Sequence, residues 1–203
     1  MVFFCLGVDL LRGLEPAWDA GCRVLVLGSF PSAASLAAGA YYGNARNHFW
    51  PLMARSLGAP ELVEATLGER AGLLRGRGVA LWDVWLACER EGSLDSAIRD
   101  GVPNDVSGLV ARMPALRAIL LNGGGAAEAF ASRVVPELLG RKPRPEEAPR
   151  HIGAPVRLSL ADGRVVAAIR MPSTSPVPSA RFRTLEDRHA VWAPALRGAL
   201  GFR

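Results

Sequence analysis

Four short apolar runs punctuate the chain, and each is followed by small or polar residues and then by a helix-like stretch. The runs are rich in Val, Ile and Leu and lie at Val24 to Leu27, Val79 to Trp82, Ala118 to Leu121 and Val165 to Ile169. Uninterrupted apolarity is typical of strands covered on both faces. Alternation with helices predicts right-handed crossovers and a mainly parallel, four-stranded sheet. The expected fold class is α/β, a three-layer α/β/α sandwich.

The remaining pattern predicts the outer layers and one further strand. Predicted helices run from His48 to Leu57, Pro60 to Leu74, Val106 to Arg112, Ala126 to Leu139 and Leu185 to Leu200. Asp162 and Gly163 are typical of a hairpin turn, so Val156 to Leu160 is expected to add an antiparallel edge strand. The segment from Arg141 to Arg150 holds three prolines and alternating charges, which predicts an exposed loop.

Length and cysteine usage narrow the class of protein. A chain of 203 residues, half of them hydrophobic, suits one domain over residues 1–203. We expect the protein to be a monomer. The apolar opening Val2 to Leu11 is too short to cross a bilayer, so we expect a buried element there and no membrane partner. Cys5, Cys22 and Cys88 form no disulfide, zinc or iron-sulfur pattern, which favours a cytoplasmic protein. We expect no metal and no cofactor.

Charge adds a weak indication of the partner. The formal net charge is +5, and Lys142 is the single lysine among 24 basic residues. A basic excess suits a polyanion, because each neutralised phosphate releases counterions, yet many soluble proteins carry such a balance. Charge alone therefore selects no function.

The residues directly after the apolar runs carry the candidate chemistry, because open parallel sheets bind ligands beyond the carboxyl ends of their strands. They are Gly28, Ser29, Phe30, Pro31 and Ser32, then Asp83, then Asn122 with three glycines, and finally Ser173, Thr174 and Ser175. Glycines admit a ligand to the backbone, hydroxyls donate to anionic oxygens, and Asp83 and Asn122 can read a polar edge. Any one loop is explained by turn formation, whereas together they predict a crevice for a planar polar molecule carrying phosphates.

A second candidate stretch runs from Tyr41 to Trp50. Tyr42, with its neighbour, is expected to stack on a base, and Asn47 is expected to cap a helix or to hold a water. Phe49 is assigned mainly to the core, with an edge at the base site.

These segments resemble the hypoxanthine-DNA glycosylase branch, or sixth family, of the uracil-DNA glycosylase superfamily. The matching motifs are Gly28 to Ser32, Ser35 and Leu36, Tyr41 and Tyr42, Asn47 to Trp50, Ala80 to Val84, Cys88 to Ile98, Leu121 to Gly123, and Pro172 to Pro176. Ser32 replaces a glycine of the family pattern, and Ala40 replaces a glutamine. The resemblance covers most of the chain, with order and spacing preserved.

The resemblance implies a monofunctional enzyme that hydrolyses the N-glycosidic bond of a deaminated base flipped out of DNA. Hypoxanthine is the expected base and uracil the second candidate. Many superfamily members activate water with an acid or amide in the first motif and a histidine in the last. Phe30 and Met171 stand there in this chain, so the resemblance points to Asn47 as the catalytic residue that orients the water.

The resemblance also assigns the binding residues. Gly28, Ser29, Phe30, Pro31, Tyr42, Phe49, Asp83 and Asn122 are expected to contact the base, and Ser173, Thr174, Ser175, Val177 and Arg181 the DNA strand. Asp83 accepts a lactam N–H or caps the following segment. Asn122 contacts the base or closes its turn. Val177 and Pro178 are expected to enter the gap left by the flipped nucleotide, and Arg181 and Arg183 contact the DNA backbone or are simply solvated.

Two other functions remain open from the sequence. A lesion-binding module that lost turnover is compatible with the missing acid and histidine. A phosphoester hydrolase would use the same loops, but the chain lacks a Lys-Ser/Thr phosphate loop, a metal-carboxylate cluster and a Gly-x-Ser-x-Gly motif.

Overall fold

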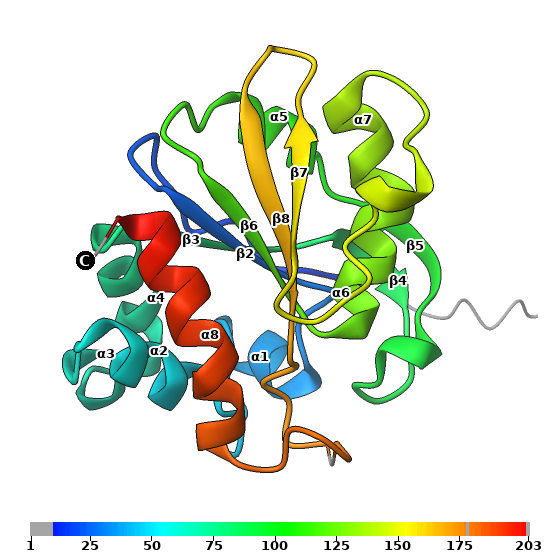
Figure 1. The fold of residues 1–203 in the computed structure, drawn as a ribbon. Coiled ribbons are helices and arrows are strands. Elements are labelled where there is room, and N and C mark those ends of the chain that lie inside the picture. Colours follow the sequence, from blue (N-terminus) through cyan, green and yellow to red (C-terminus); the bar gives the residue numbers. More distant parts are fainter. Residues whose placement is uncertain (1–9, 178, 202–203) are drawn as a thin grey trace, which may run out of the picture.

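The computed structural model describes residues 10–177 and 179–201, and a five-stranded sheet lies at its centre (Figure 1). The strands are β2 (Val24–Gly28), β3 (Val79–Asp83), β6 (Ala118–Asn122), β7 (Pro155–Ser159) and β8 (Val165–Met171), in the order β3-β2-β6-β8-β7. β7 pairs antiparallel with β8, and the other neighbours are parallel. The predicted four-stranded parallel sheet and its antiparallel edge strand are both confirmed.

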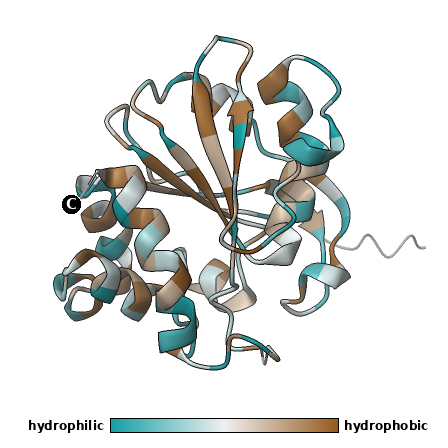
Figure 2. Cartoon of the chain, in the orientation of Figure 1, coloured by the Kyte–Doolittle hydropathy of each residue, from teal (hydrophilic) through white to brown (hydrophobic). Residues whose placement is uncertain are grey.

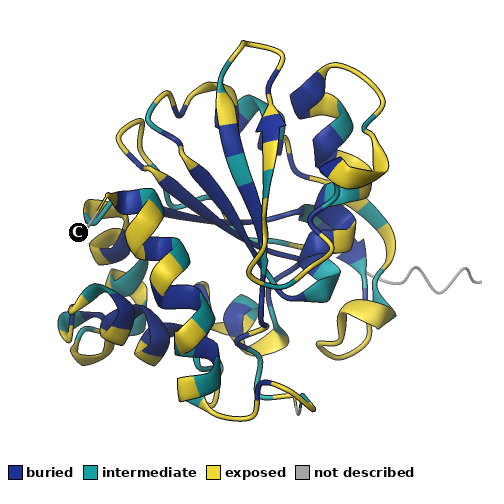
Figure 3. Cartoon of the chain, viewed as in Figure 1, coloured by how far each residue is buried: buried dark blue, intermediate teal, exposed yellow. Residues whose placement is uncertain are grey.

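Helices cover both faces of this sheet. On one face lie α2 (Phe49–Leu57), α3 (Glu61–Glu64), α4 (Leu67–Gly76) and α8 (Leu185–Leu200); on the other lie α5 (Val106–Ala111), α6 (Gly124–Ala129) and α7 (Val135–Leu139). Successive strand residues serve opposite faces: Val24 and Val26 pack with Trp192, whereas Leu25 and Leu27 pack with Phe130. The central strands are accordingly hydrophobic and buried along their length (Figures 2 and 3). The α/β/α sandwich is confirmed.

Two predicted helices are interrupted. The stretch from Pro60 to Leu74 divides into α3 and α4, because Thr66 and Glu69 form a capping box that starts a new helix. The stretch from Ala126 to Leu139 starts earlier, at Gly124, and passes through a π-helical turn, Phe130–Val134, before α7. Pro136 lies in the first turn of α7 and has no N–H to donate to the preceding turn, which fits the wider turn there. A short helix that the pattern did not predict, α1 (Ala33–Ala38), follows β2.

A second, antiparallel sheet was also not predicted. Its strands are β1 (Leu11–Arg12), β4 (Trp85–Glu89) and β5 (Arg99–Pro103), in the order β1-β4-β5. Of the apolar opening, residues 2–9 with Cys5 lie outside the described residues, and Leu11 pairs with Cys88. Cys22 and Cys88 are buried. Within the described part of the chain, no helix is long and apolar enough to traverse a membrane.

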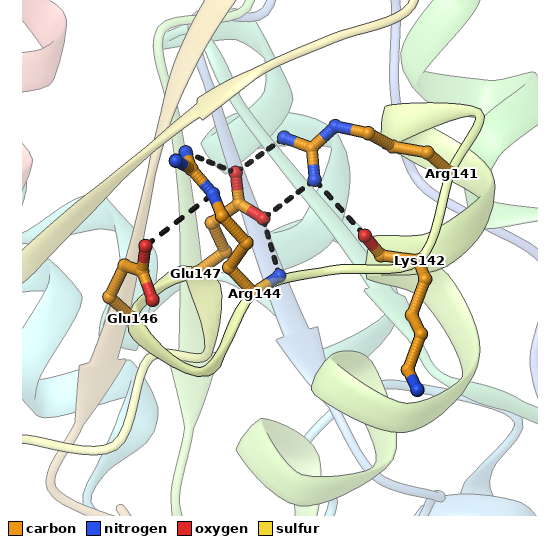
Figure 4. Close-up of polar contacts among 5 residues, drawn as sticks. All are labelled: Arg141, Lys142, Arg144, Glu146 and Glu147. Carbon is orange, nitrogen blue, oxygen red and sulfur yellow. Dashed lines mark hydrogen bonds and ion pairs between the residues drawn. The ribbon is translucent and has the colours of Figure 1, made fainter.

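The segment from Arg141 to Arg150 is a loop, as predicted, but it is anchored by a buried carboxylate (Figure 4). Glu147 is only 5% exposed and accepts hydrogen bonds from Arg141 Nη1 at 2.9 Å and Nη2 at 2.6 Å. Arg144 adds its backbone N–H at 2.7 Å. The hydrogen bonds from Arg141 hold the pKa of Glu147 well below its usual range. The expectation of an entirely exposed loop is therefore wrong at Glu147, because paired arginines compensate the burial of its charge.

Candidate active site

The carboxyl ends of the parallel strands open into a pocket of about 360 Å³. The base- and DNA-contacting residues predicted from the sequence line it, except for Phe49, Arg181 and Arg183, and for Pro178, which lies outside the described residues. Those brought together are Gly28, Ser29, Phe30, Pro31, Tyr42, Asn47, Asp83, Asn122, Ser173, Thr174, Ser175 and Val177. Residues from four strand ends and from the loop before α2 thus share one cavity, as the topology of a parallel sheet requires.

Asp83 forms a buried wall of this pocket. It is the last residue of β3, is 5% exposed and stands opposite Gly28 of β2. Its Oδ2 has no hydrogen-bond partner within the described ranges. Burial raises the pKa of Asp83 to about 7, and the charge of Asp95 adds to the increase. A Cβ on residue 28 would lie 2.2 Å from Asp83 Oδ1, so the glycine at this position makes room for the carboxyl group.

Asp95 is a pocket residue that the sequence did not single out. It lines the cavity from the segment between β4 and β5, and Ser29 Oγ donates a short hydrogen bond to its Oδ1. The only sequence signal was its place inside the motif from Cys88 to Ile98. Two carboxyl groups therefore line one pocket, whereas the sequence pointed to Asp83 alone.

Phe30 is held by a buried arginine. The guanidinium carbon of Arg90 lies 4.9 Å from the centre of the Phe30 ring, and Arg90 Nη2 donates to Pro31 O at 2.5 Å. Arg90 is 8% exposed and follows β4, so the second sheet supports the first loop of the site from behind. Phe30, which is 7% exposed, is thereby held in place at the pocket wall.

Tyr42 faces the pocket and Phe49 lies behind it. The two rings stack with centroids 3.6 Å apart and planes 15° apart. Phe49 has no exposed surface and is absent from the pocket wall, so the expected contact of its edge with a base is wrong. Its ring instead supports Tyr42, whose φ of 54° lies in the left-handed region that non-glycine residues rarely adopt.

Asn47 accepts a hydrogen bond from a backbone N–H of the first turn of α2 and borders the pocket, so the capping role is supported and the holding of a water stays a prediction. Its Oδ1 accepts a hydrogen bond from the backbone N–H of Phe49 at 3.0 Å, at the start of α2, and its side chain lines the pocket. Among the residues described, none pairs with its Nδ2. An amide oxygen has two lone pairs, so one remains for a water hydrogen.

Asn122 links three parts of the pocket. Its Nδ2 donates to Tyr42 Oη at 3.2 Å and to Thr174 Oγ1 at 2.9 Å, and its Oδ1 accepts from Thr174 N at 3.0 Å. Of the two roles left open for this residue, these bonds favour positioning over direct recognition of a base.

The loop from Ser173 to Ser175 is fastened to α8 by Arg188. This arginine is 2% exposed, and its Nε donates to Ser173 O at 2.8 Å. Its Nη1 donates to Thr184 O at 2.8 Å. The backbone N–H of His48 also donates to Thr174 O, at 3.0 Å, which joins the loop to the start of α2.

Beyond the loop, Val177 is 51% exposed and lines both the pocket and an adjoining groove of about 670 Å³. The groove has Arg46, Arg183 and Arg188 in its walls. Arg181 is exposed and lies against the Phe182 ring, outside both cavities. The expected wedge residue Pro178 falls outside the described residues.

Comparison with known proteins identifies the family. Residues 16–195 match the family model described as the uracil DNA glycosylase superfamily. The chain belongs to this superfamily. Two curated relatives, both named hypoxanthine DNA glycosylase, come from Methanosarcina acetivorans and Methanosarcina barkeri. The first is 40% identical over 58% of this chain and 73% of the relative; the second is 35% identical over 55% and 70%.

A solved structure agrees with the superfamily assignment. The solution NMR structure of a protein from Methanosarcina acetivorans, described as a candidate uracil DNA glycosylase, has a TM-score of 0.68 and 29% identity, covering 94% of this chain and 99% of that one. At the head of the last superfamily motif, Met171 is fully buried and offers no group to polarise water. In the described ranges no three His, Cys, Asp or Glu side chains gather as metal ligands.

Proposed function

We propose that this protein is a monofunctional DNA glycosylase that hydrolyses the N-glycosidic bond of a deaminated base, with hypoxanthine as the principal substrate and uracil as the second. It acts as a monomer and without a bound metal. One observation carries the proposal: Asn47, Asp83 and the loop from Ser173 to Ser175 line the same pocket at the carboxyl ends of the strands. The names of the two curated relatives support hypoxanthine as the first substrate to test.

The proposed reaction uses a flipped nucleotide. Phe30 and Tyr42 offer aromatic surface to the base, and the loop from Ser173 to Ser175 offers hydroxyl and N–H donors to a phosphate. Asn47 Oδ1 orients a water toward C1′. The C1′–N bond breaks with its electron pair on the base, water supplies the hydroxyl group to C1′, and the base acquires a proton.

The test is excision from duplexes that carry one deoxyinosine or one deoxyuridine, followed by alkaline cleavage of abasic sites. We expect product from deoxyinosine. Asn47→Ala should retain DNA binding and lose excision by about a hundredfold or more, in the range of a lost positioning group. Asn44→Ala is the matched control, because Asn44 lies in the same loop and accepts from Arg46 N at 3.0 Å outside the pocket.

The competing function, a lesion-binding module without turnover, gives a different result in the same assay. Selective binding of deoxyinosine DNA with intact strands at enzyme excess would favour it. Undiminished excision by Asn47→Ala would instead keep the glycosylase and reject Asn47 as the residue that orients the water.

A further inference from the structure

Four side chains form a polar cluster at one wall of the pocket. Asp83 and Asp95 both line it, Ser29 donates to Asp95, and Arg90 lies behind Phe30. Neither aspartate takes part in an ion pair within the described part of the chain. Two carboxyl groups that share one cavity disfavour two negative charges at once.

The surroundings differ for the two carboxyl groups. Asp83 is enclosed: no described residue pairs with its Oδ2, and Gly28 lies against Oδ1. Asp95 is exposed, and its Oδ1 accepts a hydrogen bond from the Ser29 hydroxyl. Because enclosure disfavours a charge, the enclosed member of such a pair, Asp83, is the one that carries the proton.

The other groups near Asp83 leave this distribution intact. Among the described residues, Arg90 is the one cation that lowers the pKa of Asp83; its Nη2 donates to Pro31 O, and its Nε and Nη1 have no hydrogen-bond partner there. From the loop before α2, the neighbouring ionisable groups are the phenols of Tyr41 and Tyr42, whose pKa values burial raises, so both are neutral. Burial and Asp95 outweigh Arg90, and the pKa of Asp83 rises to about 7.

We propose that Asp83 meets the flipped base as a neutral carboxyl group that donates a hydrogen bond to it, and that Asp95 keeps Asp83 in this form. The proposal rests on the proposed function and assigns Asp83 a catalytic role. A lactam base presents a carbonyl oxygen, which accepts the carboxyl O–H. As the C1′–N bond breaks, its electron pair moves onto the base and the oxygen becomes a better acceptor. The hydrogen bond therefore strengthens in the transition state, whereas an ionised Asp83 would repel the departing anion.

The decisive experiment is the pH profile of single-turnover excision of deoxyinosine at saturating enzyme. The wild-type rate should be constant at low pH and fall about tenfold per pH unit once Asp83 ionises, near pH 7. Asp83→Asn keeps an N–H donor, so its rate should stay within about tenfold of the wild type at low pH and lose the fall at high pH. Asp95→Asn removes a negative charge and should move the fall to lower pH.

A second measurement does not depend on turnover. The carboxyl ¹³C shift of Asp83 in the free, full-length protein should titrate near pH 7, with a lower midpoint in Asp95→Asn. Asp162→Asn, in the hairpin turn away from the pocket, is the control and should leave both profiles unchanged.

The outcomes separate the two proposals. A wild-type rate that is flat or rises across about pH 6 to 9, or an Asp83→Asn profile with the wild-type fall, would overturn the role of Asp83 and leave the glycosylase intact. Absence of excision at every pH would overturn the proposed function itself. An Asp83 carboxyl that titrates in the usual range near 3.8 would overturn the neutral form even if excision is observed.

Discussion

Asn122 and Thr174 are joined by two hydrogen bonds in opposite directions. Thr174 N donates to Asn122 Oδ1 at 3.0 Å, and Asn122 Nδ2 donates to Thr174 Oγ1 at 2.9 Å. Thr174 has no exposed surface, so water does not replace these bonds. Because Asn122 also donates to Tyr42 Oη, one amide fixes the loop from Ser173 to Ser175 relative to the aromatic wall.

Replacing Asn122 by alanine should loosen both walls at once. We expect Asn122→Ala to lower the free energy of unfolding by about 1–3 kcal/mol, because one backbone donor, Thr174 N, and two acceptor oxygens lose their partner. Excision should decrease with it. Thr174→Val should have a smaller effect than Asn122→Ala, since it removes one hydroxyl and keeps the backbone N–H that donates to Asn122. Urea unfolding measures the stability of both variants, and single-turnover excision measures their activity. Equal effects of both substitutions would contradict the linking role of Asn122.

Gly28→Ala should impair excision more than it impairs stability. The new Cβ would lie 2.2 Å from Asp83 Oδ1, so the carboxyl group has to move, while the strand backbone can remain in place. The cost of such overpacking is about 1–3 kcal/mol. Gly72→Ala in α4 is the control: nothing lies within 4 Å of its added Cβ, and helix propensity predicts a gain of about 0.5–1 kcal/mol. Wild-type excision by Gly28→Ala would show that the position of Asp83 is unimportant.

Arg188→Lys should weaken DNA binding although it keeps the charge. A lysine ammonium cannot reproduce the planar fork that reaches the carbonyls of Ser173 and Thr184. The loop would lose its attachment to α8. Arg197→Lys is the matched control on the same helix, because Arg197 makes a single long bond of 3.4 Å to Ser56 O. Binding of deoxyinosine DNA across a salt series measures the effect. An unchanged affinity in Arg188→Lys would mean that the loop holds its shape without this arginine.

The central sheet was predictable because its signal is local. Each parallel strand is a continuous apolar run, and its two faces are covered by helices with helical apolar spacing. The second sheet gives no such signal. Arg99–Pro103 contains Asp100, Gly101 and Pro103, which are rare in strands, and it forms only through pairing with β4.

The site was predictable to the extent that it follows strand ends. Asp83 and Asn122 were found from topology alone, since they directly follow apolar runs. Asp95 was not found, because its contact with Ser29 spans 66 residues of sequence and its loop has no periodic pattern. Adjacent aromatics posed a different difficulty. The sequence assigned Phe49 mainly to the core but left it an edge at the base site, whereas in the structure its ring stacks on Tyr42 and has no exposed surface.

Acid should remove the contribution of Glu147 to stability. Hydrogen bonds from Arg141 lower its pKa below the ordinary 4.5, so the folded protein holds the charged form more strongly than the unfolded chain does. The stabilisation is complete above the unfolded pKa and disappears as the pH falls through the lower folded value. Glu147→Gln should therefore be less stable than the wild type at neutral pH, and the difference should shrink in acid. Urea unfolding at about pH 7 and about pH 3 measures this difference in stability.

Glu146→Gln is the control, because Glu146 is exposed and pairs with Arg144 at 3.4 Å, where screening by water leaves little stabilisation. A difference that stays constant with pH would assign the role of Glu147 to its shape and neutral hydrogen bonds, since only the charged form responds to protonation.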